Sequence, residues 1–128
     1  MNNDELNGIG AEILDSCIAV HKELGPGLLE SAYTIALKKE LEDREYEVMT
    51  QVPIEASYKG INLGKVFVMD MIVDDGVILE IKSVDQLHPI HKAQLITYLK
   101  LSKRKLGYLI NFNVSLMKDG FHRIVYKF

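Results

Sequence analysis

Apolar residues recur along the chain at two spacings, and each spacing predicts a different kind of element. From residue 6 to residue 24 they recur every three or four residues, which predicts an amphipathic helix that ends at Gly25-Pro26-Gly27. Further helices are predicted over residues 28–44 and from His88-Pro89 to about residue 102, since proline suits a first helical turn. Alternating or unbroken apolar runs predict strands over residues 47–58, 64–73, 77–84, 106–112 and 121–126, with a turn at Lys59-Gly60. The predicted order is two helices, three strands, a third helix and two strands.

The size and composition of the chain suit a single domain over residues 1–128. It has 128 residues, 48% of them hydrophobic, which is enough for a buried core. No apolar run approaches a membrane span and the N-terminus lacks signal-peptide regions, so we expect a soluble, cytoplasmic protein with no membrane partner. The only cysteine, Cys17, lies in an apolar helical stripe and predicts a core residue, which excludes an internal disulfide and a thiolate zinc cluster.

Three charged residues interrupt the apolar strands on either side of residues 74–76, namely Asp70, Glu80 and Lys82. Because side chains alternate along a strand, Glu80 and Lys82 share one face. A two-residue loop would place Asp70 opposite Ile81 and on the other face. A three-residue loop, with Gly76 left-handed after a type I turn, places Asp70 opposite Glu80. We predict the three-residue loop.

Two carboxylates facing each other in a partly buried setting repel, and each also loses hydration. A cation must offset both effects. Lys82 supplies one positive charge, and a divalent cation such as Mg²⁺, which prefers oxygen ligands, would supply more. The pattern is therefore consistent with a metal site, but taken alone it favours a solvated cross-strand ion pair.

Polar residues on two of the predicted helices are further candidates for this site. Glu30 heads an otherwise apolar stripe of residues 33, 37 and 41, which favours an inward orientation; an acid in a first helical turn also complements the helix dipole without any metal. His91, Gln94 and Tyr98 fall on one line of the third helix. Gln94 and Tyr98 would hydrogen-bond a phosphate or Lys82, or else form a polar helix edge with a half-buried tyrosine.

Charge is unevenly distributed along the chain. The net charge is −3, yet the residues from 87 onward hold eight of the fifteen Lys and Arg residues and one of the eighteen acids. Such asymmetry suits a basic face for phosphate backbones, although exposed lysines on a helix also form an ordinary solvated face. Zinc at His88 and His91 is disfavoured because His21 and His122 lie on remote elements.

Four motifs in order resemble a known family. They are Gly27-x-x-Glu30-x-x-Tyr33, Asp70 after a strand that starts at Gly64, Glu80-Ile81-Lys82, and Gln94-x-x-x-Tyr98. Together they resemble the GxxExxY family, which is placed in the PD-(D/E)XK nuclease superfamily near its RecB-like branch. The likeness runs from about Ile9 to Phe112. Met69 departs from the superfamily pattern, which has proline before the Asp, at a position that bears no metal ligand.

The resemblance implies an α/β restriction-endonuclease-like core, a central mixed β-sheet flanked by helices. It also implies that Asp70, Glu80 and the Ile81 carbonyl bind Mg²⁺, or Mn²⁺ in its place, with Glu30 as a further ligand. Lys82 would then lie beside the attacking water, with Gln94 and Tyr98 positioning Lys82 or the phosphate.

The expected activity is Mg²⁺-dependent hydrolysis of phosphodiester bonds, with DNA as the expected nucleic acid. The residues expected to contact nucleic acid are Lys92, Lys100, Lys103, Arg104 and Lys105. The alternative is a catalytically inactive module that keeps the fold and binds nucleic acid or a protein partner. A homodimer is a further expectation, since so small a nuclease would grip a duplex better as two copies.

Overall fold

The computed structural model describes residues 1–128 and has an α/β fold with a five-stranded mixed sheet. The helices are α1 (Asn3–Leu24), α2 (Glu30–Asp43) and α3 (Pro89–Ser102), with a short 3-10 helix η1 (Met117–Asp119). The strands are β1 (Val48–Tyr58), β2 (Ile61–Val73), β3 (Val77–Lys82), β4 (Leu106–Asn111) and β5 (Phe121–Val125). Their order in the sheet is β1-β2-β3-β4-β5; β3 and β4 run parallel, and every other pair runs antiparallel. The predicted element order and fold class are confirmed.

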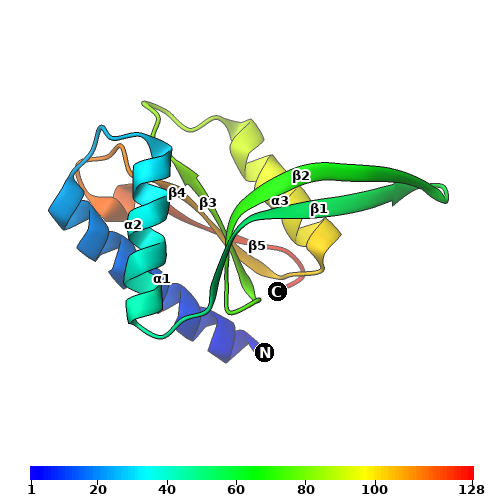
Figure 1. Ribbon diagram of the computed structural model, residues 1–128, viewed down its shortest axis with the longest axis horizontal. Helices are drawn as coiled ribbons and strands as arrows, with labels where there is room; N and C mark the ends of the chain where they lie inside the picture. The colour runs from blue at the N-terminus through cyan, green and yellow to red at the C-terminus, as the bar shows by residue number, and fades with distance from the viewer.

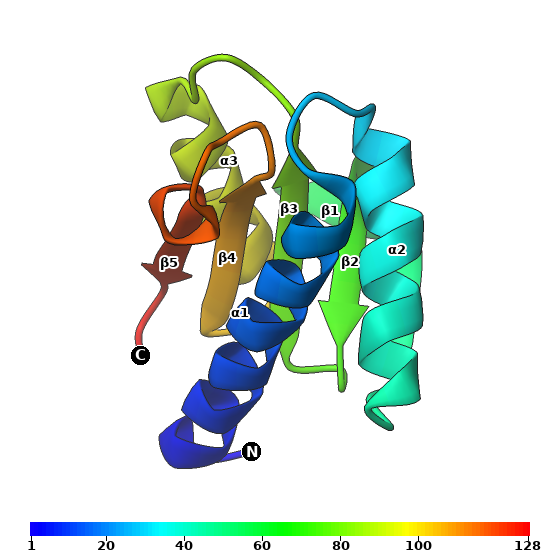
Figure 2. The same ribbon diagram turned by 90° about the vertical axis from the view of Figure 1, so that its left-hand side faces the viewer.

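Helices cover both faces of the sheet. In Figure 2, α1 and α2 lie in front of the strands and α3 lies behind them. One apolar core lies between α1, α2 and the sheet and includes Leu79; the other lies under α3 and includes Ile78. Strand β3 is buried on both faces, which explains why its sequence is an almost unbroken apolar run. A charged residue within β3 is therefore placed in an environment where it must have a partner.

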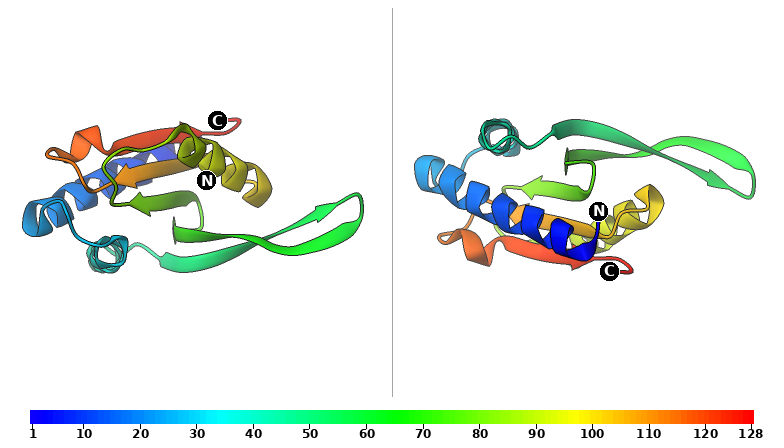
Figure 3. Two further views of the ribbon diagram at one scale, coloured as in Figure 1. Left: turned by 90° about the horizontal axis from the view of Figure 1, so that it is seen from above. Right: turned by 90° about the horizontal axis from the view of Figure 1, so that it is seen from below.

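Strands β1 and β2 continue beyond the sheet as a two-stranded ribbon. The ribbon projects well past the helices in Figures 1 and 3. Its tip turns at Lys59 and Gly60, whose φ angles of 47° and 82° fit a two-residue type I′ turn between Tyr58 and Ile61. The turn position is confirmed, but the predicted start of β2 at Gly64 is wrong. Gly64 has a φ of 72° and marks a bulge inside the strand, since Ala56 pairs with Gly64 and Ser57 with Asn62.

The loop between β2 and β3 has three residues, as predicted, because Val73 pairs with Val77. The predicted left-handed glycine in that loop is wrong. Asp74 and Asp75 take positive φ angles of 49° and 55°, whereas Gly76 does not. Aspartate is among the residues that tolerate this conformation best.

Contacts from other elements explain this turn. The Asp74 carboxylate accepts a 2.8 Å hydrogen bond from the Glu47 amide, and Arg104 donates to the Asp75 carboxylate at 2.6 Å. A Cβ on Gly76 would lie 2.5 Å from the Met1 side chain and 3.1 Å from that of Leu6. Gly76 thus leaves room for the ends of the Met1 and Leu6 side chains, and its backbone angle does not call for glycine.

Cys17 is buried in the core as predicted, and burial raises the pKa of its thiol. None of the helices has both the length and the apolar character needed to cross a membrane.

Candidate active site at the fork of the sheet

Asp70 and Glu80 face each other where β2 leaves β3. The pairing of β2 with β3 runs from Val73 to Met71 and ends there, so the next residue, Asp70, stands opposite Glu80. Beyond this point β2 follows β1 into the ribbon (Figure 1). The sheet therefore forks at the two carboxylates.

At the fork, hydrogen bonds from backbone amides to the two carboxylates take the place of the backbone hydrogen bonds between β2 and β3. The Ile81 amide donates a 2.8 Å hydrogen bond to Oδ2 of Asp70, and the Asp70 amide donates to Oε1 of Glu80 at 3.2 Å. Each acid is thus held by an amide of the neighbouring strand. Because the N–H and C=O of one strand residue point toward the same neighbouring strand, the Ile81 carbonyl also points toward Asp70.

Burial dominates the electrostatics of this pair. Glu80 is only 7% exposed, and loss of hydration, followed by the nearby charge of Asp70, raises the pKa of Glu80 to about 8. Lys82, next but one on the same strand, acts in the opposite direction and lowers that pKa. Burial thus favours the protonated form of Glu80 as long as no stronger positive charge is present. A divalent cation would supply that charge.

Glu30 approaches the end of β3 from the start of α2. It is solvent-exposed, unlike the apolar residues that follow it in its stripe, and its Oε2 accepts a 3.2 Å hydrogen bond from the Ser83 amide. The Ser83 hydroxyl in turn donates to the Leu28 carbonyl at 2.6 Å. These two bonds connect the N-terminus of α2 to the C-terminal end of β3.

Tyr33 of the same motif has a structural role. Its hydroxyl donates to the Gly25 carbonyl at 2.6 Å and accepts from the Leu28 amide at 3.1 Å. Its ring is buried and stacks on Phe112 with a centroid separation of 4.5 Å. Tyr33 therefore fixes the segment that leads into Glu30.

Tyr98 and His91 border the site from α3. Tyr98 packs edge-on against Phe67, and burial, together with the charges of Glu80 and Asp70, raises its pKa to about 12. Burial and the charge of Lys82 lower the pKa of His91, whose Nδ1 accepts from the His88 amide at 3.3 Å. No hydrogen bond joins Gln94 or Tyr98 to Lys82.

The predicted ligands are only partly assembled. Asp70, Glu30 and Ile81 line one hollow of about 380 Å³ between α2 and β1, whereas Glu80 and Lys82 do not line it. No group of three or more His, Cys, Asp or Glu side chains is placed to hold a metal ion. The donor set nevertheless fits a hard cation, because it offers two adjoining carboxylates, one of them with a strongly raised pKa, and a carbonyl.

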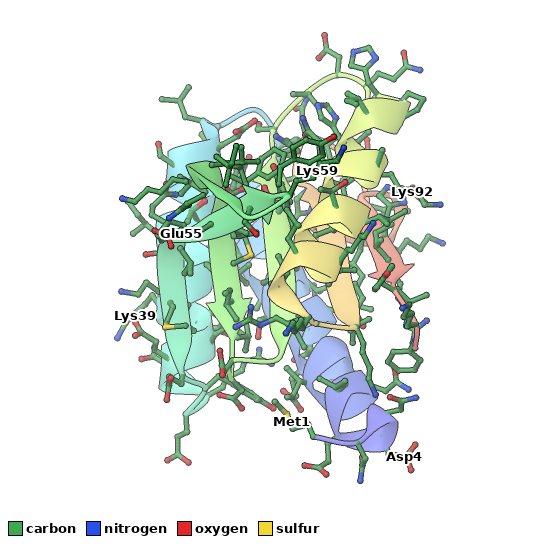
Figure 4. All side chains as sticks on the ribbon, turned by 90° about the vertical axis from the view of Figure 1, so that its right-hand side faces the viewer. Met1, Asp4, Lys39, Glu55, Lys59 and Lys92 are labelled. Atoms are coloured by element: carbon green, nitrogen blue, oxygen red, sulfur yellow. The ribbon has the colours of Figure 1, made fainter.

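The predicted basic residues fall into two separate places. Lys92 lies beside a hollow at the N-terminal end of α3, and Figure 4 shows it on that helix. Lys100, Lys103, Arg104 and Lys105 surround a second hollow of about 290 Å³ at the other end of α3, together with Lys127. Arg104 is already bonded to Asp75. The larger basic cluster is thus remote from Asp70 and Glu80.

Sequence reasoning missed two residues that the structure brings to the site. Ser83 follows the Glu80-Ile81-Lys82 motif directly, but its bonds to α2 depend on a contact distant in sequence. Gln51 lines the same hollow as Asp70 and Glu30, and nothing in its local sequence distinguishes it from an ordinary exposed strand residue.

Comparison with known protein families gives one match. The family model described as the PD-(D/E)XK nuclease superfamily matches residues 7–124. Neither the curated proteins nor the solved structures gave a match.

Proposed function

The chain belongs to the PD-(D/E)XK nuclease superfamily, and on that basis we propose that it is a metal-dependent nuclease that hydrolyses phosphodiester bonds of DNA. One observation carries this proposal. Asp70 and Glu80 are opposed at a partly buried fork of the sheet, where the pKa of Glu80 is raised to about 8, with Lys82 two residues further along β3. Such a pair has little structural use, because two apolar residues would stabilise the same place better.

The proposed metal ligands are Asp70, Glu80, the Ile81 carbonyl and Glu30. When bound, Mg²⁺ or Mn²⁺ would supply positive charge that activates water and offsets negative charge on the phosphate. Glu80 must give up its proton to serve as a ligand, so metal affinity rises with pH up to about 8. The Lys82 ammonium donates hydrogen bonds to the attacking water or to a phosphate oxygen, which stabilises the charge that develops there. Tyr98 and Gln94 orient the substrate from α3.

The other sequence predictions belong to the same proposal. They are the GxxExxY and RecB-like affiliation, one nuclease domain over residues 1–128, and nucleic-acid contacts through Lys92, Lys100, Lys103, Arg104 and Lys105. A homodimer and a cytoplasmic location stay predictions from the sequence.

The test is cleavage of labelled DNA by the purified protein with Mg²⁺, Mn²⁺ or EDTA. We expect cleavage with either metal and none with EDTA. Lys82→Ala should abolish cleavage and leave the melting temperature unchanged, because Lys82 makes no side-chain hydrogen bond. Lys39→Ala is the matched control, since Lys39 lies on the exposed side of α2 and pairs only with Asp43. Undiminished cleavage by Lys82→Ala would contradict the proposal.

A second function has one observation in its favour. The Glu30 carboxylate is bonded to the Ser83 amide, and no three acids are assembled to hold a metal. This arrangement suits an inactive module that binds nucleic acid or a protein partner. Calorimetric titration separates the two functions: binding of Mg²⁺ or Mn²⁺ that is lost in Asp70→Asn supports the nuclease, and absence of binding supports the inactive module.

A further inference from the structure

Gln51 has a left-handed backbone in the interior of a strand. Its φ is 53°, and it lies within β1. The other non-glycine residues with positive φ lie in turns, next to helix ends or beside the C-terminus. A residue held in this conformation without a turn to explain it is a typical feature of ligand-binding sites.

The strand register places Gln51 opposite Asp70. Thr50 pairs with Met71 and Val52 with Met69, whereas the pair between them is missing from the ladder. Pairing with β3 also ends just before Asp70. Asp70 therefore lacks a regular strand partner both on the β1 side and on the β3 side. Gln51 is the residue that faces it on the β1 side.

Gln51 also lines the hollow that Asp70 and Glu30 share. The hollow contains no basic side chain, and the side chains with donors left free for a ligand are Gln51, Ser31 and Thr50, since the Thr34 hydroxyl donates to the Glu30 carbonyl. A phosphate that enters beside two carboxylates needs neutral donors of this kind. A lysine or arginine at position 51 would instead pair with Asp70 and compete with a bound cation.

We propose that this hollow is the subsite for the nucleotide next to the scissile phosphate, and that Gln51 positions this nucleotide by donating its side-chain amide to a phosphate oxygen. The inference rests on the proposed nuclease function and adds to it a substrate contact on β1. Gln51 is a positioning residue, since it acts on a phosphate that does not react.

The test uses three variants at position 51 and one control. Gln51→Gly removes the amide and relieves the left-handed backbone, whereas Gln51→Asn keeps an amide and tolerates that backbone. Gln51→Glu adds a negative charge to the hollow. Glu45→Gly is the matched control, because Glu45 has a φ of 69° just after α2 and lies outside the hollow.

Three quantities are measured: the melting temperature, kcat/KM for cleavage of a DNA oligonucleotide, and fluorescence anisotropy of the labelled oligonucleotide with Mg²⁺ in a Lys82→Ala background. We expect Gln51→Gly to melt at or above the wild-type temperature, as Glu45→Gly does. Its affinity and kcat/KM should fall about ten- to hundredfold, as expected for loss of a hydrogen bond to a charged group. Gln51→Asn should recover part of the loss, and Gln51→Glu should be at least as poor as Gln51→Gly.

The outcomes separate this inference from the proposed function. If Gln51→Gly binds and cleaves as well as Glu45→Gly, the subsite is wrong whatever the wild type does. If the wild type cleaves nothing but its binding of the oligonucleotide weakens in Gln51→Gly, the nuclease proposal fails and the subsite is supported. If the parent protein does not bind the oligonucleotide, both are overturned. If Gln51→Gly does not fold, the comparison of Gln51→Glu with Gln51→Asn decides the question. The subsite requires lower affinity and lower kcat/KM in Gln51→Glu than in Gln51→Asn.

Discussion

The ring of Tyr33 lies parallel to that of Phe112, with planes within 4° and centroids 4.5 Å apart. This contact joins α2 to the segment that follows β4, and it carries the hydroxyl of Tyr33 to the loop before Glu30. The stack and the hydroxyl thus have separable roles. The stack contributes to the core, and the hydroxyl positions a proposed metal ligand.

Tyr33→Phe should separate these roles. The ring stays stacked, but the Gly25 carbonyl and the Leu28 amide lose their partner, which lowers the free energy of unfolding by about 1–3 kcal/mol. Because Leu28 and Ser83 hold Glu30 in place, cleavage should also fall at temperatures well below melting. The measurements are urea unfolding and kcat/KM. Tyr46→Phe is the control, since the Tyr46 hydroxyl makes no hydrogen bond to another residue; an equal effect of both variants would show that the hydroxyl of Tyr33 has no special role.

The raised pKa of Glu80 predicts how stability depends on pH in the metal-free protein. The pKa is about 8 in the folded state against 4.5 in the unfolded state, so the folded protein binds the extra proton. Its stabilising effect is complete below about pH 4.5 and is lost as pH rises toward 8, by at most roughly 1.4 kcal/mol per pH unit. Urea unfolding between pH 5 and 9 measures this loss.

Glu80→Gln is the control for that pH dependence. Glutamine stays neutral, still accepts from the Asp70 amide and can donate to the Asp70 carboxylate. The loss of stability between pH 5 and 8 should therefore shrink in this variant. If the free energy of unfolding changes with pH in the same way for the wild type and for Glu80→Gln, Glu80 is not the group that binds the extra proton.

Metal binding should raise the melting temperature. A cation that binds only the folded protein stabilises it by about 2.7 kcal/mol at a concentration of 100 Kd, which corresponds to several degrees for a domain of this size. Differential scanning calorimetry with Mn²⁺ measures the shift, and Asp70→Asn should remove it. Asp75→Asn, in the turn at the other end of β3, is the matched control and should keep it.

Two glycines of α1 should respond oppositely to alanine. A Cβ on Gly10 would clash with the Tyr108 hydroxyl, so Gly10→Ala must displace that side chain and destabilises the protein by about 1–3 kcal/mol. Gly8 has no atom within 4 Å of the same position, so Gly8→Ala should stabilise the helix by up to about 1 kcal/mol. Thermal unfolding of both variants checks the packing of α1 on β4, and similar melting temperatures would contradict it.

Local patterns were sufficient for some of these features and not for others. Alternation along two strands and the length of one loop predict that Asp70 stands opposite Glu80, because side-chain period and loop length together set the register of a hairpin. The reason for Gly76 was missed, since it depends on Met1 and Leu6 approaching from the far end of the chain. The left-handed backbone of Gln51 was missed because no residue type near it encodes such an angle. The bulge at Gly64 lies where the sequence predicts a strand end, since glycine is typical of both.

The basic C-terminal end of α3 lies at a fixed distance from Asp70 and Glu80. Arg104 connects that end to the segment before β3 through a hydrogen bond to Asp75. Glu80 and Lys82 lie near the C-terminal end of β3. A helix of 14 residues and a strand of six both span roughly 20 Å. On the proposed nuclease function, a DNA strand that contacts Lys103 and Lys105 while its scissile bond lies at Asp70 would be roughly six nucleotides long, at about 3.4 Å per nucleotide. Shorter pieces would be held at one end only, so digestion would slow at a characteristic fragment length.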